Sequence, residues 1–197
     1  AAMDPQQRLL LERGYAALHG AGLDRVSLAG RGVAVLVGVA ATGYADILRA
    51  SAATRRSVYA ATGAACSVAS GRLSFALGLH GPCASVDTAC SASLVALHAG
   101  LQSLRLSECD EALVAGVNLM LAPFMGLSFA IAGMTSARGR CHTFDGRADG
   151  YARAEACGCA ALVHEAMSDA DVRGCAVRQD GRSASLTAPN GGAQQAL

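Results

Sequence analysis

One cysteine lies where the sequence changes from a strand pattern to a helix pattern. Cys90 stands within the segment VDTACSAS, residues 86–93, between a short apolar stretch and a long alanine- and leucine-rich run. A thiol at such a turn faces the amino end of a helix, whose positive pole stabilises a thiolate. The backbone N–H groups around Ala89, Cys90 and Ser91 can also hold a developing oxyanion. This pattern fits a cysteine nucleophile, and it also fits a small buried residue at the end of a strand.

Other polar residues give weaker signals. A cluster from His142 to Asp149, followed by Glu155, is typical of a solvated loop. Asn118 stands in an otherwise apolar strand pattern, where a hydrogen-bonded core side chain is the simplest interpretation. The histidines are at positions 19, 80, 98, 142 and 164, and none lies in a metal-binding pair. The sequence therefore predicts no metal site.

The eight cysteines are scattered, at positions 66, 83, 90, 109, 141, 157, 159 and 175. Disulfide frameworks belong to short secreted chains, which this is not. Cys157 and Cys159 form a C-x-C pair instead of the C-x-x-C pairs typical of zinc. We therefore expect free thiols that are mostly buried, since cysteine packs as a small hydrophobic residue.

Composition favours a folded body and excludes several classes of function. The chain has 197 residues, of which 52% are hydrophobic and 16% charged, with a net charge of +1. Without a basic stripe, nucleic-acid binding is not expected. The longest near-apolar run, residues 32–41, is far shorter than the roughly 20 residues that span a bilayer. Without a signal-peptide pattern, we expect a cytoplasmic or organellar protein that is not secreted.

Strand patterns alternate with helix patterns along the chain, which predicts an α/β layered fold. Helices are expected at residues 4–20, 44–51, 67–79 and 91–106, the last carrying Leu94, Leu97, His98, Leu101 and Leu104 at helical spacing. Strands are expected at residues 33–39, 82–87, 111–120 and 158–164, with a further short one at 175–177. Residues 133–150 and 180–192 are predicted to be loops. No linker or repeat interrupts this pattern, so one domain is expected.

Five blocks in order resemble the ketosynthase domain of type I polyketide synthases, in the thiolase-like superfamily. They are DPQQRLLLE at 4–12, GPCASVDTACSASLVALH at 81–98, AGVNLML at 115–121, GRCHTFDGRADGYARAE at 139–155 and QDGRSASLTAPNG at 179–191. The resemblance covers residues 3–197 and implies a thiolase-like α-β-α fold, of which this chain represents mostly the N-terminal half.

The resemblance also implies a reaction. Cys90 would take an acyl chain from the phosphopantetheine arm of an acyl carrier protein, with no other cofactor bound. A malonyl-type extender is then decarboxylated, and its carbanion attacks the Cys90 thioester. Two histidines of the family assist, one in a His-Gly-Thr-Gly-Thr block and one in a Gly-His block, and neither block occurs here. The family places both beyond Leu197, so this chain is expected to be a fragment of a longer enzyme or a truncated product.

Three further roles come from the resemblance alone. The strand before Cys90 resembles the one that pairs with its copy in a homodimer. Phe144 resembles a gate beside the active site, and Thr187 and Asn190 stand in a segment that lines the substrate entrance. The family usually has glycine at Ala154 and Ala156, so alanine there is expected to strain a turn.

Two alternatives to a condensing enzyme stay open. A transacylase or hydrolase would use Cys90 without forming a β-keto product, and a scaffold remnant would use no nucleophile at all. A cysteine protease is disfavoured, because no histidine is placed by motif to serve Cys90.

Overall fold

A four-stranded sheet forms the centre of the part of the chain that the structure describes. The computed structural model describes residues 2–41, 43–164 and 170–196. The strand order is β2 (Cys83–Val86), β1 (Val33–Val39), β3 (Glu111–Asn118) and β4 (Ala156–Leu162). β1 runs parallel to β2 and β3, whereas β4 is antiparallel to β3. The three parallel strands therefore present their carboxyl ends at one edge of the sheet.

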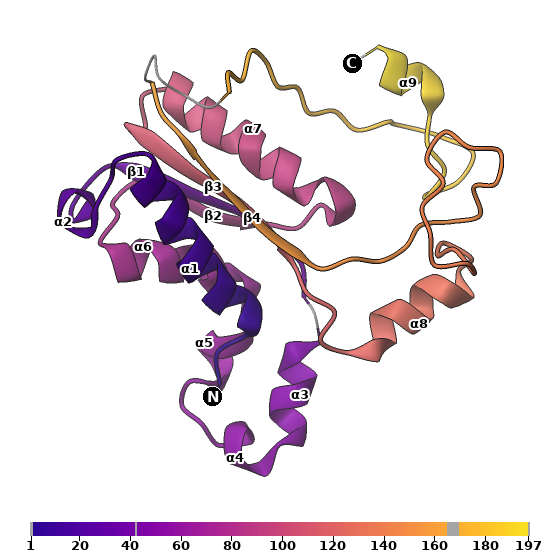
Figure 1. The fold of residues 1–197 in the computed structure, drawn as a ribbon, viewed down its shortest axis with the longest axis horizontal. Coiled ribbons are helices and arrows are strands. Elements are labelled where there is room, and N and C mark those ends of the chain that lie inside the picture. The colour runs from indigo at the N-terminus through magenta and orange to yellow at the C-terminus, as the bar shows by residue number, and fades with distance from the viewer. Residues whose placement is uncertain (1, 42, 165–169, 197) are drawn as a thin grey trace.

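Helices cover both faces of this sheet, which confirms the predicted α/β layering. They are α1 (Pro5–Gly20), α2 (Arg25–Leu28), α3 (Tyr44–Ala50), α4 (Ala52–Arg55), α5 (Ala60–Ala64), α6 (Cys66–Leu77), α7 (Ala92–Arg105), α8 (Pro123–Ile131) and α9 (Gly191–Gln195), with a 3-10 turn η1 (Ala89–Ser91) before α7. Figure 1 shows α1 and α6 on one side of the sheet and α7 on the other. Helices α8 and α9 lie outside these layers (Figure 1).

The apolar run of β1 is buried along its whole length, as expected for a central parallel strand. Successive side chains of a strand point to opposite faces, so this run supplies two separate cores. Val33, Val35 and Val37 pack on the side of α1 and α6 with Leu10 and Leu73. Ala34 and Leu36 pack on the side of α7 with Ala96 and Leu104.

The start of α1 ties together the strand ends near the candidate site. Asp4 caps the helix by accepting a hydrogen bond from the Gln6 N–H at 2.8 Å. The buried Gln6 side chain accepts from the Leu119 N–H at 3.1 Å and donates to the Ala40 carbonyl at 3.4 Å. These partners follow β3 and β1 directly. The DPQQ block therefore fixes the carboxyl ends of the two central strands relative to each other.

Helix α7 meets the sheet mainly through small residues, with Leu104 as the one large side chain among its buried positions. Its buried positions are Ala92, Ala96, Gly100, Ser103 and Leu104, while Leu94 is 63% exposed. A Cβ on Gly100 would lie 2.8 Å from a methyl carbon of Val114. The helix backbone thus lies too close to the strands for large side chains, and the leucine spacing alone does not reveal the buried face.

The elements mostly follow the sequence-based expectations, although the short helices α2, α4 and α5 were not expected. Residues 175–177 form no strand. Helix α8 was not expected, because residues 123–131 are apolar except for Ser128 and show little periodicity. The loop predicted at 180–192 ends in the short helix α9, for which Asn190 is the N-cap. Ala154 and Ala156 do not have positive φ, so the expected turn strain at these positions is absent.

The eight thiols are free, as expected, but their predicted burial is largely wrong. Cys109 alone among them is buried, and Cys66, Cys157, Cys159 and Cys175 are half-buried, while Cys83, Cys90 and Cys141 are exposed. The reason is that sheet-edge and turn positions leave even apolar residues beside solvent. Separately, none of the described helices is both long enough and apolar enough for a membrane span.

Candidate active site

Cys90 lies in a tight turn between the carboxyl end of β2 and the start of α7. Asp87 accepts a hydrogen bond from the Ala89 N–H at 3.0 Å, which closes an Asx turn. The Ser91 hydroxyl lies 2.9 Å from both the carbonyl and the hydroxyl oxygen of Thr88. These bonds fix the backbone on both sides of Cys90. The structure thus brings Ala89, Cys90 and Ser91 together in one 3-10 turn, η1.

The turn is strained at Ala89, which adopts a φ of +54°. A non-glycine residue in this left-handed region costs roughly 1–2 kcal/mol. Such strain persists where surrounding contacts fix the backbone, and it is common where a strand turns sharply into a helix that carries a nucleophile. The effect here is that the Cys90 side chain is exposed instead of packed into the core.

The N–H groups of the turn differ in their partners. The Ala89 N–H is bonded to Asp87, and the Ser91 N–H donates to the Thr88 carbonyl at 3.3 Å. In residues 2–41, 43–164 and 170–196, no acceptor is found for the Cys90 N–H. An oxyanion next to the thiol would therefore meet one free donor, at the amino end of a 14-residue helix.

Two glycines that sequence reasoning did not single out position this turn. Gly38 of β1 and Gly116 of β3 are register partners on adjacent strands. A Cβ on Gly38 would lie 2.6 Å from the Ala92 carbonyl carbon and the Ser93 nitrogen, and one on Gly116 would lie 2.7 Å from Ser93 Cβ. The first turn of α7 thus rests directly on the strand backbones. Gly38 interrupts the valine-rich run of β1, and that interruption was the available signal.

The loop that carries Phe144 is organised by its own charges. Asp149 accepts hydrogen bonds from Ser136 at 2.6 Å and from Arg138 at 3.0 Å, and the pKa of its carboxyl is lowered chiefly by the Ser136 hydrogen bond. Arg147 pairs with Asp145 at 2.6 Å. Phe144 itself is fully exposed with a φ of +59°. In the described residues, no hydrogen bond or ion pair joins this loop to the Cys90 turn.

The other two expected pocket residues lie in the C-terminal segment. Asn190 receives the Ala193 N–H at 3.2 Å and donates its side-chain amide to the Asp180 carbonyl at 3.3 Å. Thr187 lies exposed in the preceding turn. Figure 1 shows this segment, with α9, apart from the sheet. Asn190 thus orders its own loop, and no hydrogen bond between it and Cys90 is present among the described residues.

Asn118 is exposed at the end of β3, not buried as the sequence suggested, but it is hydrogen-bonded. Its amide donates to the Ala154 carbonyl at 2.9 Å, and Glu155 accepts from the Met120 N–H at 2.7 Å. These bonds connect the loop before β4 to the same sheet edge that carries Cys90. Asn118 and Glu155 therefore have structural roles.

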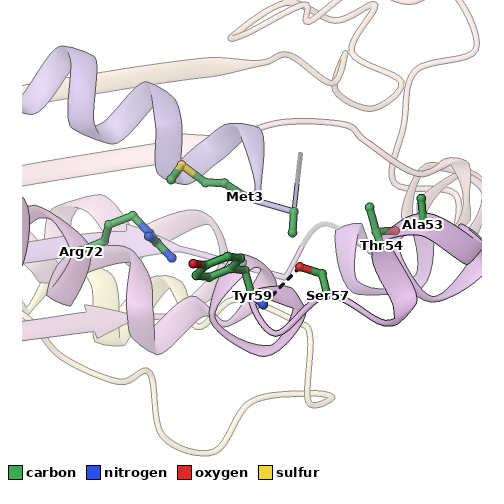
Figure 2. A pocket seen from close by; sticks show the side chains of 8 residues that line it. Met3, Ala53, Thr54, Ser57, Tyr59 and Arg72 are labelled. Atoms are coloured by element: carbon green, nitrogen blue, oxygen red, sulfur yellow. Dashed lines mark hydrogen bonds between the residues drawn. The ribbon is translucent and has the colours of Figure 1, made fainter.

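A surface hollow of about 410 Å³ lies elsewhere, between the start of α1 and helices α4, α5 and α6. Figure 2 shows Met3, Tyr59 and Arg72 around it. Arg72 already donates to the Gln7 side chain at 2.7 Å and to the Thr62 carbonyl at 3.2 Å. Its guanidinium therefore serves to join α6 to α1 and α5. None of the lining residues belongs to the Cys90 turn.

Comparisons with known proteins agree with this geometry. Residues 1–168 match the family model described as "Beta-ketoacyl synthase, N-terminal domain". The chain is 48% identical over 201 residues to a phenolphthiocerol/phthiocerol polyketide synthase of Mycobacterium tuberculosis, covering 98% of this chain and 13% of the relative. It is 47% identical over 210 residues to a second phenolphthiocerol/phthiocerol polyketide synthase protein of the same organism, covering 100% of this chain and 9% of that protein. The chain thus spans about an eighth or less of these relatives.

Solved structures give the same result. The ketosynthase from module 6 of the bacillaene synthase of Bacillus subtilis, in a cysteine-to-serine variant, superimposes with a TM-score of 0.86 at 33% identity. The match covers 100% of this chain and 34% of that chain. An oxazolomycin ketosynthase domain from Streptomyces albus matches with a TM-score of 0.74 at 33% identity, covering 82% of this chain and 28% of that chain.

The layered sheet and the turn between β2 and α7 define the thiolase-like class of α/β proteins. Within that class the chain belongs to the beta-ketoacyl synthase family. It corresponds to part of a type I polyketide synthase ketosynthase domain, as the sequence motifs predict.

Proposed function

We propose that this chain provides the acyl-accepting part of a β-ketoacyl synthase, with Cys90 as the nucleophile. The observation that carries the proposal is the exposed Cys90 thiol on a strained turn, between the carboxyl end of a parallel strand and an α-helix. Ligands of α/β proteins bind at this edge of the sheet. Family membership supports an acyl thioester as the substrate class.

The proposed step is a thioester exchange with an acyl carrier protein. The Cys90 thiolate attacks the carbonyl carbon of an acyl group that is bound to the carrier's phosphopantetheine sulfur. The Cys90 N–H donates to the oxyanion of the tetrahedral intermediate. The bond to the phosphopantetheine sulfur then breaks, that sulfur leaves as a thiol with the proton that Cys90 released, and the acyl group stays on Cys90.

Condensation requires more than Cys90, so we assign it to the parent enzyme and not to this chain alone. The family uses two histidine-bearing blocks for decarboxylation of the extender, and neither occurs in the 197 residues. Phe144, Thr187 and Asn190 are proposed to line the acyl entrance in that enzyme. On this basis the chain alone accepts an acyl group but releases no β-keto product.

We further propose that the parent enzyme is a homodimer joined through β2. β2 pairs with β1 on one side, and Cys83 and Ala84 are exposed. In the described residues the other side of β2 has no strand partner. An open edge of this kind favours pairing with a second strand. Sedimentation of the parent ketosynthase should give twice the protomer mass. An Ala84→Lys substitution should shift the measured mass toward that of the single protomer.

Acyl loading tests the nucleophile assignment. The folded chain is incubated with an acyl-phosphopantetheine carrier protein, and the acyl adduct is located by mass spectrometry. We expect one adduct, on Cys90, its loss in Cys90→Ala and its retention in Cys83→Ala, which removes another exposed thiol. Loading that persists in Cys90→Ala would overturn the proposal, and rapid release of free acid would indicate a hydrolase.

A further inference from the structure

The hollow beside the start of α1 has apolar walls and one positively charged side chain. Its volume of about 410 Å³ lies within the roughly 300–1,000 Å³ typical of small-molecule sites. Ala2, Met3 and Ala53 give it an apolar lining, and Arg72 is the one cation among the lining residues that the structure describes. None of these lining residues is acidic. The hollow therefore suits a ligand with an apolar body and a negative charge.

Two polar groups converge at one end of the hollow. Arg72 donates from Nε to the Gln7 side-chain oxygen at 2.7 Å and from Nη2 to the Thr62 carbonyl at 3.2 Å. These bonds orient the guanidinium, and within the described part of the chain its Nη1 has no acceptor. Figure 2 shows the Tyr59 hydroxyl pointing toward this guanidinium. An acceptor placed between them would receive an N–H and an O–H.

The charges around the hollow also favour an anion. The sequence from residue 47 to residue 86 contains four arginines and no acidic residue. One of them, Arg56, is exposed at the end of α4. Asp4 follows the lining residue Met3, but it is buried and caps α1. An anion beside Arg72 would therefore meet no carboxylate of the lining.

The shape of these groups selects the class of anion. A planar guanidinium binds a planar carboxylate through two parallel hydrogen bonds, and a phenolic O–H can donate a third. The apolar walls include the Tyr59 ring and the Met3 thioether. Aromatic rings stack favourably on other rings and make favourable contacts with sulfur. An aromatic ring that carries one carboxylate therefore matches both ends of the hollow.

We propose that the hollow is a binding site for an aromatic monocarboxylate. The carboxylate accepts hydrogen bonds from Arg72 and Tyr59, and the ring lies against Met3. Binding is non-covalent, and the ligand contacts residues of α4, α5 and α6 together with the segment before α1. The site is separate from the Cys90 turn, to which none of the lining residues belongs.

Titration calorimetry of the 197-residue chain with 2-naphthoate tests the proposal. We expect one bound naphthoate per chain. Tyr59→Phe removes only the hydroxyl of a side chain that is 70% exposed, so the fold should be kept. It should weaken binding about tenfold, as for the loss of one hydrogen bond to a charged group. Tyr151→Phe is the matched control at an exposed tyrosine outside the hollow, and it should leave the affinity unchanged.

Arg72→Lys keeps the charge but removes the planar fork, so it should weaken binding about tenfold or more. Because Arg72 also joins three helices, Tyr59→Phe decides the test if Arg72→Lys does not fold. Full affinity in the folded Tyr59→Phe variant would overturn the proposal.

Two related ligands separate the roles of charge and ring. 2-Naphthamide has the same ring without a charge, and it should bind at least about tenfold more weakly than 2-naphthoate. Octanoate has a carboxylate without a ring, and it should also bind more weakly. Equal affinity for the amide would overturn the role of the carboxylate, and equal affinity for octanoate would overturn the aromatic class.

Methyl NMR of the chain with ¹³C-labelled methionine locates the bound ligand. The ring current of naphthoate should shift the Met3 methyl signal, which Met3→Leu identifies. Met125 and Met134 are partly exposed on and after α8, so their signals report attachment to a different apolar surface. Shifts at these two without one at Met3 would overturn the proposal. Cys90→Ala should bind naphthoate normally, which distinguishes this site from acyl loading.

Discussion

Gly38 and Gly116 are register partners on adjacent parallel strands, and the first turn of α7 lies against both of them. A side chain at either position would occupy the space of Ala92 or Ser93. The contact at Gly38 is with backbone atoms at 2.6 Å, which cannot rotate away. These two glycines therefore set the height of α7 above the sheet, and with it the position of the Cys90 turn.

Gly38→Ala should displace the start of α7, destabilise the fold and reduce acyl loading of Cys90. The expected destabilisation is about 1–3 kcal/mol, as for overpacking of a core, measured by urea unfolding beside the loading assay. Gly158→Ala on β4 is the matched control, because a Cβ there meets no atom within 4 Å. Equal effects of the two substitutions would contradict the positioning role of Gly38.

Cys90 should be the thiol that iodoacetamide labels first. It is exposed at the amino end of α7, where the partial positive charge of the unpaired N–H groups favours attack by its sulfur. Cys109 should be labelled last, because it is buried and burial raises the pKa of its thiol. Quantitative mass spectrometry after short labelling gives the order, and similar labelling of Cys83 and Cys90 would argue against an activated thiol.

Ala89→Gly should stabilise the chain, by about 1 kcal/mol, because glycine adopts the φ of +54° without steric cost. Ala99→Gly within α7 is the comparison, and it should destabilise by about 1 kcal/mol. Thermal unfolding of both variants checks the opposite signs. A destabilised Ala89→Gly variant would show that the turn is not strained at this residue.

Gln6→Leu should destabilise the chain by about 1–3 kcal/mol in total, because two half-buried backbone groups lose their partner. The affected groups are the Ala40 carbonyl and the Leu119 N–H, at the ends of β1 and β3. Urea unfolding measures the change. Glu12→Ala, which removes an exposed ion pair with Arg8, should cost about 0.5 kcal/mol or less. A Gln6→Leu effect as small as this would rule out the bridging role.

Asp149 should titrate below the ordinary aspartate pKa of about 3.9, because Ser136 and Arg138 donate hydrogen bonds to its carboxylate. Since the folded pKa is the lower one, the loop gains stability above the unfolded value and loses it as pH falls through the folded value. A carboxyl-carbon NMR titration measures the midpoint. Ser136→Ala should raise it, and an unchanged midpoint in that variant would contradict the assigned cause.

The sequence by itself determined the local elements and the candidate nucleophile. Three elements can be recognised from residues that are close together in the sequence. They are the valine run of β1, the helix after Cys90 and the Asp4-Pro5 start of α1. The turn at Cys90 could be located because a strand pattern gives way to a helix pattern there. Burial of individual thiols and the apolar helix α8 could not be read in this way.

The tertiary structure alone decided which distant residues meet. The support of α7 by Gly38 and Gly116, the bridge from Gln6 to Ala40 and Leu119, and the hollow between the start of α1 and α6 each join segments that are far apart in the chain. Their physical basis is close packing between sheet and helix, which depends on distances that no local periodicity encodes.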